Sequence, residues 1–224
     1  SSFAAWYCGS DSANVKDVLT GFLRDLRTLL EVSRTVYVGA SSGGFAALLY
    51  GRQDPSGVVV AVNPQCNLKT YHPHAIDNFR DVCWPKEENN GTLVERIGGD
   101  LSELYAQGFP NTVIYVQSSG DMFHLNNQFS YFLSAIPPKR QNCFIADVRF
   151  WGRLGHPGSV PLHGYIPWIQ AALRSATIKG VEILETYHSL SPSGPSKANP
   201  VDKSATTEAQ TKTAVDVREW LLNN

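Results

Sequence analysis

The fold of this chain is decided by residues 35–51, which read TVYVGASSGGFAALLYG. Thr35–Gly39 is β-branched and aromatic, a composition typical of a buried strand. Residues 40–44 are small and turn-forming, and Phe45–Gly51 is expected to continue as a helix. The pattern Gly-x-Ser-x-Gly, centred on Ser41, therefore lies where a buried strand runs into a helix. In that setting the pattern predicts a serine nucleophile on a sharp strand-to-helix turn.

The crowding of such a turn explains its residues. The serine backbone is strained, and Gly39 and Gly43 are expected to avoid collisions two residues before and after it. The backbone N–H of Ser42 is expected to point at a developing oxyanion, helped by the helix N-terminus. A second register, centred on Ser42, stays open, although Ala40 fits the tight flank less well than a glycine. A phosphate-binding turn is disfavoured, because the lysine of a P-loop is missing.

Strands and helices alternate on both sides of this turn. The alternation predicts an α/β fold with a mostly parallel sheet and helices on both faces. Strand composition marks four runs, at Thr35–Gly39, Gly57–Asn63, Thr112–Gln117 and Cys143–Trp151. Helical patterns, one of them strongly amphipathic, cover Asn14–Val32, His74–Cys83, Thr92–Ala106, Leu125–Ala135 and Leu162–Ser175.

The domain organisation follows from this pattern. Residues 1–188 are expected to form one catalytic domain, in which residues 67–111 make a helical connection or a small cap. Residues 189–212 are rich in Ser, Pro, Thr, Ala and Lys, which predicts a polar linker or loop. Residues 213–224 are expected to close the chain as a short helix.

A serine nucleophile needs a base, and the base needs an orienting acid. With this type of turn the three occur in the order Ser, Asp or Glu, His. Asp121 follows the third strand and is the candidate acid; capping the next helix is its alternative role. His156 lies in a small-residue loop after the last strand and is the candidate base, with His163 as its competitor. His124, close to Asp121, is a candidate for lining the substrate pocket.

Composition excludes several classes of function. The formal net charge is -1, so no basic excess attracts nucleic acid. No apolar run is long enough to span a bilayer. The four cysteines form no C-x-x-C pair, and no histidine or cysteine cluster has metal-ligand spacing, so no metal site is expected. We therefore expect four reduced thiols in a cytoplasmic protein. The alternative is a secreted protein with one or two disulfides.

Three segments together resemble a known superfamily. GASSGGFAALLYG, GDMFHL and LGHPG are similar to the α/β-hydrolase superfamily, most of all to bacterial surface-polysaccharide O-acetyltransferases and related esterases. The likeness covers residues 6–175. By this resemblance Ser41 is the nucleophile, Asp121 the acid and His156 the base.

The resemblance implies acyl transfer through an acyl-serine, as a carboxylesterase or an O-acyltransferase, with a small-molecule or carbohydrate ester as substrate. It implies no tightly bound cofactor, with acyl-CoA as the candidate acyl donor. Aromatic side chains can stack on a sugar, which makes Trp6 and Tyr7 candidate substrate-binding residues, although aromatics more often pack in a core. The same surface could come from Tyr71, Trp84 and Trp151. The alternative is a non-catalytic binding or scaffolding domain with a hydrolase fold.

One departure from the superfamily pattern concerns the region before the Ser41 turn. A complete α/β-hydrolase has strands upstream of the helix that precedes this turn, and one of them carries the second oxyanion-hole N–H. No such strands are found before Asn14–Val32. The expectation is therefore a preceding segment of a longer protein or a partner chain at that edge, or an oxyanion hole built differently.

Overall fold

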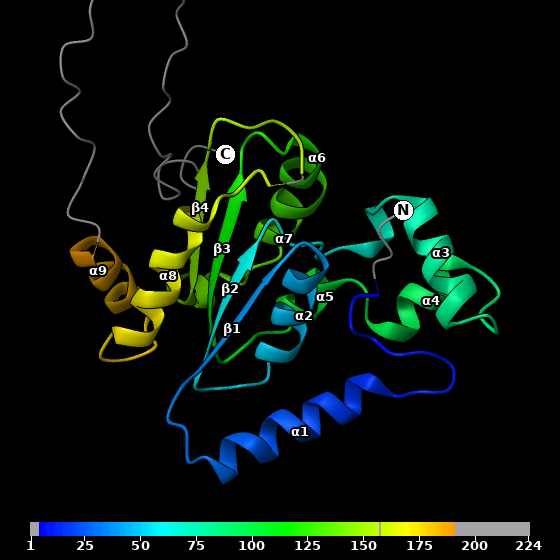
Figure 1. Cartoon of the computed structure of the whole chain (residues 1–224), viewed down its shortest axis with the longest axis horizontal. Coiled ribbons are helices and arrows are strands. Elements are labelled where there is room, and N and C mark those ends of the chain that lie inside the picture. Colours follow the sequence, from blue (N-terminus) through cyan, green and yellow to red (C-terminus); the bar gives the residue numbers. More distant parts are fainter. Residues whose placement is uncertain (1–4, 157, 191–224) are drawn as a thin grey trace, which may run out of the picture.

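The computed structural model describes residues 5–156 and 158–190, which form a four-stranded, all-parallel sheet with helices on both faces (Figure 1). The strands lie side by side in sequence order: β1 (Thr35–Ala40), β2 (Gly57–Val62), β3 (Thr112–Ser118) and β4 (Phe144–Arg149). This confirms the predicted α/β class. Because all four strands run parallel, their carboxyl ends meet at one edge, where the segments that follow them converge.

Alternation along the buried strands divides the core into two layers. Successive side chains of β2 point to opposite faces, so Val59 and Ala61 join one apolar cluster and Val58 and Val60 join the other. The first cluster contains buried side chains of α2, α3, α4, α5 and α7, and the second contains Trp168 of α8 and Ile183 of α9. Both faces of β2 and β3 are therefore covered, which explains why β2 and residues 113–116 of β3 are apolar.

Nine α-helices are found in the described ranges, and none is long and apolar enough to cross a bilayer. They are α1 (Val15–Leu29), α2 (Ser42–Gly51), α3 (Pro73–Cys83), α4 (Asn90–Ile97), α5 (Leu101–Ala106), α6 (Met122–His124), α7 (Ser130–Ser134), α8 (Leu162–Arg174) and α9 (Gly180–Leu190). Helical turns of the 3₁₀ or π type cover Leu68–Thr70, Leu125–Phe129 and Pro138–Cys143.

One predicted helix is wrong, and one helix was missed. The helix expected over Thr92–Ala106 is two helices, because Gly98 turns left-handed (φ 67°) at the end of α4 and Asp100 caps the start of α5. Helix α9 was not predicted, and its end at Leu190 lies two residues inside the predicted linker. The rest of that linker and the predicted helix at residues 213–224 lie outside the described residues. The structure gives none of the four cysteines a disulfide partner among the described residues.

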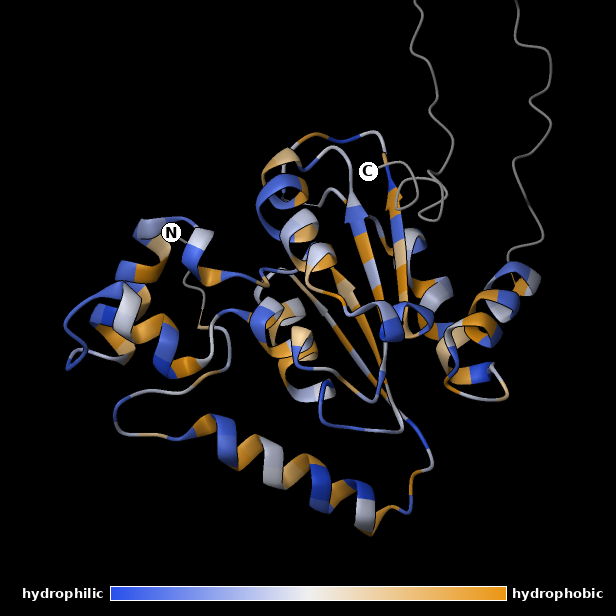
Figure 2. Cartoon of the chain, turned by 180° about the vertical axis from the view of Figure 1, so that it is seen from behind, coloured by the Kyte–Doolittle hydropathy of each residue, from blue (hydrophilic) through white to orange (hydrophobic). Residues whose placement is uncertain are grey.

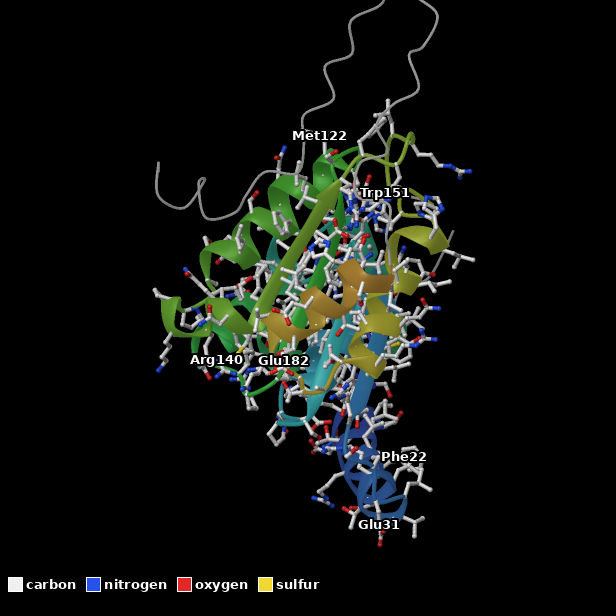
Figure 3. The ribbon with its side chains drawn as sticks, turned by 90° about the vertical axis from the view of Figure 1, so that its left-hand side faces the viewer. Phe22, Glu31, Met122, Arg140, Trp151 and Glu182 are labelled. Atoms are coloured by element: carbon white, nitrogen blue, oxygen red, sulfur yellow. The ribbon has the colours of Figure 1, made fainter. Side chains whose placement is uncertain are left out.

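Helix α1 lies away from the sheet and buries none of its residues (Figure 1). Apolar side chains still recur along it, as the hydropathy colouring of Figure 2 shows. Phe22 is 57% exposed, and Figure 3 places it at one end of the molecule with Met122 and Trp151 near the opposite end. Strand β1 pairs only with β2, so its other edge has no strand partner among the described residues.

Candidate active site

The Ser41 turn has the strained geometry that its sequence predicts. Ser41 follows β1 directly and has φ 57° and ψ −122°, a conformation that non-glycine residues rarely adopt. Three backbone hydrogen bonds hold it: the Ser41 N–H donates to Val62, and its carbonyl accepts from Phe45 and Gln65. The turn is therefore fixed by its own helix and by the segment after β2.

The glycines of the turn are needed for different reasons than expected. A Cβ on Gly39 would lie 2.0 Å from the Gly43 carbonyl oxygen, so this position has no room for a side chain. A Cβ on Gly43 would meet nothing within 4 Å, and the predicted collision there is wrong. The second crowded position is Gly44, where a Cβ would lie 2.7 Å from the Pro64 ring. Gly44 instead packs α2 closely against the segment that follows β2.

Ser41, His156 and Asp121 form one continuous chain of hydrogen bonds. The Ser41 Oγ lies 2.8 Å from the His156 Nε2, and the His156 Nδ1 lies 2.6 Å from the Asp121 Oδ2. The structure thus brings the three predicted residues together across 115 positions of sequence. It gives no such contact to His163, which is exposed on α8. Ser42 is the first residue of α2, where backbone N–H groups have no intrahelical acceptor.

The loops that carry Asp121 and His156 are bonded to one another. The Ser119 N–H donates to the Arg149 carbonyl, and the Gly155 N–H donates to the Gly120 carbonyl at 2.9 Å. A Cβ on Gly120 would lie 2.1 Å from the Arg153 carbonyl oxygen, so only glycine allows the loops to approach this closely. Asp121 and His156 are therefore held by backbone contacts as well as by their own hydrogen bond.

His124 is a second histidine on the same carboxylate. Its Nδ1 lies 3.1 Å from the Asp121 Oδ1, and its ring stacks on the His156 ring with centroids 3.9 Å apart. The same Asp121 oxygen accepts the His124 backbone N–H, so Asp121 also caps α6 as its alternative role required. His124 is 1% exposed, and its Nε2 has no hydrogen-bond partner among the described residues. It lies behind His156 and not on an open pocket wall.

The surroundings of Asp121 and His124 favour an ionised carboxylate and a neutral His124 ring. Burial acts to raise the pKa of Asp121, but hydrogen bonds from His124 and His156 outweigh it, and the pKa is well below its ordinary value. Burial lowers the pKa of His124, against the opposing pull of the Asp121 carboxylate. Asp121 is therefore an ionised acceptor for both rings, and its Oδ2 lies 2.6 Å from the His156 Nδ1.

No family profile matches this chain, and no curated protein matches it by sequence. Among solved structures it is similar to the capsule O-acetyltransferase of Neisseria meningitidis serogroup A. The TM-score is 0.51 at 17% sequence identity, over 76% of this chain and 69% of that one. A histidine-to-alanine mutant of that enzyme in complex with CoA gives a TM-score of 0.50 at 16% identity, over 75% and 68% of the two chains. Likeness at this level of identity is a likeness of fold.

The aromatic candidates for substrate binding lie in different places. Trp6 is fully buried, so the prediction that it offers a stacking surface is wrong. Tyr7 is 55% exposed and lines a hollow of about 280 Å³ beside β1 and α2, together with Tyr37 and Tyr50. The Tyr71 ring lies 6.0 Å from that of His124, centroid to centroid, which places it at the site. The Trp84 ring contacts the guanidinium group of Arg96, and the Trp151 ring contacts that of Arg149.

One polar residue at the site was missed from the sequence. The Gln65 side-chain amide donates to the Ser41 Oγ at 2.7 Å and to the Tyr71 hydroxyl at 2.8 Å. Gln65 comes three residues after β2, at the same sheet edge as Ser41. The rule that residues after parallel strands converge at one edge could have identified it.

The described residues contain one group that could hold a metal ion, formed by Asp121, His124 and His156, with ligand atoms within 4.8 Å of one another. The carboxylate of this group accepts hydrogen bonds from both rings, and the remaining His156 nitrogen faces Ser41. Each of these contacts uses an atom that metal binding would need. These contacts join a hydroxyl, an imidazole and a carboxylate in the order that a nucleophile, a base and an acid would need.

Proposed function

We propose that this chain is a serine-dependent acyltransferase that forms an acyl-enzyme on Ser41. The observation that carries the proposal is the hydrogen-bonded sequence Ser41–His156–Asp121, built on a strained strand-to-helix turn. This geometry supports the proposal, because acyl transfer of this kind needs a nucleophile, a general base within hydrogen-bond reach, and an acid that fixes the base. A non-catalytic domain would have no need to maintain the strained Ser41 backbone.

The chemistry follows from these contacts. The Ser41 Oγ attacks the carbonyl carbon of the acyl donor while its proton passes to the His156 Nε2. As the tetrahedral intermediate collapses, the bond to the leaving group breaks, and His156 returns the proton to that group. Asp121 keeps the His156 Nδ1 protonated and stabilises the charged ring. An acceptor then attacks acyl-Ser41, again with His156 removing its proton, and the free Ser41 hydroxyl is restored.

The donor and acceptor are proposed from the structural neighbours. One neighbour is a capsule O-acetyltransferase and another was solved with CoA, which favours acetyl-CoA as donor and a carbohydrate hydroxyl as acceptor. Water as the acceptor would make the same site a carboxylesterase. Membership of the α/β-hydrolase superfamily is part of this proposal, supported by the turn geometry and by the order Ser, Asp, His.

The partner expected at the β1 edge also stays a proposal. The outer edge of β1 has no strand partner among the described residues, and Val38 on this strand is 44% exposed. Helix α1 lies on the same side, where Leu23 lines a hollow with Val38, and it leaves Phe22 and other apolar side chains exposed. Unpaired strand edges and exposed apolar faces are where further polypeptide segments bind. We therefore expect a further segment, from this protein or a partner, to cover this side.

The test is acetyl transfer from acetyl-CoA, followed as thiol release with and without a capsular oligosaccharide. We expect release to be faster with the oligosaccharide, the acetyl group to appear on the sugar, and Ser41→Ala to abolish both. Activity should survive EDTA, because no step uses a metal. Release that ignores the sugar would make the enzyme a hydrolase. No release and no acetylated Ser41 in a folded chain would contradict the proposal.

A further inference from the structure

The Gln65 side chain has a place beside the nucleophile that a passive packing residue would not need. Its Nε2 lies 2.7 Å from the Ser41 Oγ, and Gln65 is 3% exposed. The Gln65 backbone N–H also donates to the Ser41 carbonyl at 3.2 Å. Main-chain and side-chain contacts therefore both fix the amide against the strained turn.

Trp6 determines which end of the amide faces Ser41. The indole N–H can only donate a hydrogen bond, and it lies 2.6 Å from the Gln65 Oε1. The carbonyl end must therefore face Trp6, which leaves the NH₂ end for the Ser41 Oγ and the Tyr71 hydroxyl. Trp6 is itself immobilised, because it is fully buried and packs edge-on against Tyr71 and Phe79.

The Ser41 hydroxyl donates its proton to the His156 Nε2, so its oxygen accepts the hydrogen bond from the Gln65 amide with a lone pair. When the Oγ attacks a carbonyl, the negative charge develops on an oxygen bonded to the same carbon as the Oγ. A donor already beside the Oγ lies next to that oxygen and needs no large movement to stabilise it. Preoriented donors of this kind lower the barrier of acyl transfer, even when they carry no net charge.

We propose that the Gln65 amide is the second oxyanion-hole donor, beside the Ser42 backbone N–H, and that Trp6 is the positioning residue that holds it. The inference rests on the proposed acyl transfer at Ser41. Here the second donor comes from the segment that follows β2.

The decisive variant is Gln65→Glu, which keeps the shape and the acceptor for Trp6 but places a carboxylate oxygen where the donor was. Removing one oxyanion-hole donor costs about 100- to 1,000-fold in kcat. We expect a loss of that size in hydrolysis of p-nitrophenyl acetate, with little change in KM. Binding of a trifluoromethyl ketone, whose adduct carries the oxyanion, should weaken by a similar factor. The charge-matched control is Gln107→Glu, on the exposed end of α5, which should behave as the native chain.

Trp6→Phe is the second variant, because it removes the N–H that orients the amide and keeps an aromatic ring. We expect it to lower kcat less than Gln65→Glu does, with an unchanged circular dichroism spectrum. A Gln65 with a merely structural role would lower the melting temperature or raise KM and leave kcat of the folded protein unchanged, which would overturn the proposal. The Ser41→Ala comparison separates the two claims. If the native chain reacts at Ser41 and Gln65→Glu reacts equally fast, only the Gln65 proposal fails.

Discussion

The carboxyl edge of the sheet and the α1 side of the molecule differ in how their side chains are held. At the carboxyl edge, Ser41, His156, Asp121 and Gln65 are joined by hydrogen bonds of 2.6 to 2.8 Å, and their loops are bonded to one another. On the α1 side no residue of the helix is buried. A polar contact from Arg27 to the carboxylate of Asp54 ties this helix to the body.

This difference indicates which part of the chain determines the chemistry. Every contact that positions Ser41 and His156 comes from residues at the carboxyl edge, and none comes from α1 within the described ranges. We therefore expect substitutions at the edge to change catalysis strongly and conservative substitutions on α1 to change little. The predictions below test this contrast, beginning with the largest effect.

Replacing Asp121 by Asn should cost the most activity. The amide oxygen can still cap α6, but it no longer stabilises a protonated His156, and the ring can adopt the wrong tautomer. In serine enzymes of this kind the same change lowers kcat about 10,000-fold. The matched control is Asp100→Asn, since Asp100 is also buried and also caps a helix but faces no histidine. Equal losses in the two variants, measured with p-nitrophenyl acetate, would show that Asp121 acts only through the fold.

His124→Phe should have a smaller effect on rate and a visible effect on pH dependence. A phenyl ring can still stack on His156, but it cannot donate a hydrogen bond to Asp121. A hydrogen bond to a charged group contributes a free energy that corresponds to about a 10- to 100-fold change in an equilibrium or rate constant. We expect a fall of that order in kcat. The pKa of Asp121 should rise, because one of the hydrogen bonds that hold it down is gone.

The pH dependence of stability follows from the buried ring. Burial lowers the pKa of His124 in the folded chain, while the groups that face it are Asp121, His156 and His72. His124 therefore binds a proton near pH 6.5 in the unfolded chain and only at a lower pH in the folded chain. Because protonation favours the unfolded chain, the free energy of unfolding falls as the pH drops below that value. His124→Phe should reduce the fall between pH 7 and pH 5, measured by urea denaturation. His163→Phe, on an exposed histidine, should keep it; identical slopes in all three chains would refute the assignment.

The smallest effect is expected on α1. Phe22→Ala removes a ring that is 57% exposed, so the free energy of unfolding should change by no more than about 0.5 kcal/mol. The same substitution at Phe132, which is fully buried against Tyr105 and Tyr115, should cost about 3–5 kcal/mol. Both values come from urea denaturation of the same chain. A large loss at Phe22 would mean that α1 is part of the core.

The same contrast separates what the sequence predicts from what it does not. Strands β1, β2 and β3 were located to within one residue. Short runs of β-branched residues such as GVVVAV at 57–62 are typical of strands that are buried on both faces. The helix expected over residues 92–106 was wrong because periodicity continues across Gly98, while the left-handed turn there ends α4. Local turn chemistry decided that boundary, and the apolar pattern did not.

For the site, the residues that the sequence singled out follow strands or lie in a local motif. Ser41 lies in a recognisable turn, and Asp121 and His156 follow strands in the expected order. The place of Gln65 after β2 also indicates this sheet edge, but the orientation of its amide depends on a hydrogen bond from Trp6, 59 residues earlier, and no short motif encodes that pair. Trp6 was misread as a surface for sugars, because an indole that orients a buried amide has the same composition signal as one that is exposed.

The central claim, an activated nucleophile at Ser41, is tested most directly by labelling with a fluorophosphonate probe. The native chain is compared with Ser41→Ala and with Ser42→Ala as the register control. The account predicts that the probe labels the native chain and Ser42→Ala, and that labelling is lost in Ser41→Ala. A folded native chain that takes up no label, or a label that persists in Ser41→Ala and disappears in Ser42→Ala, would contradict it.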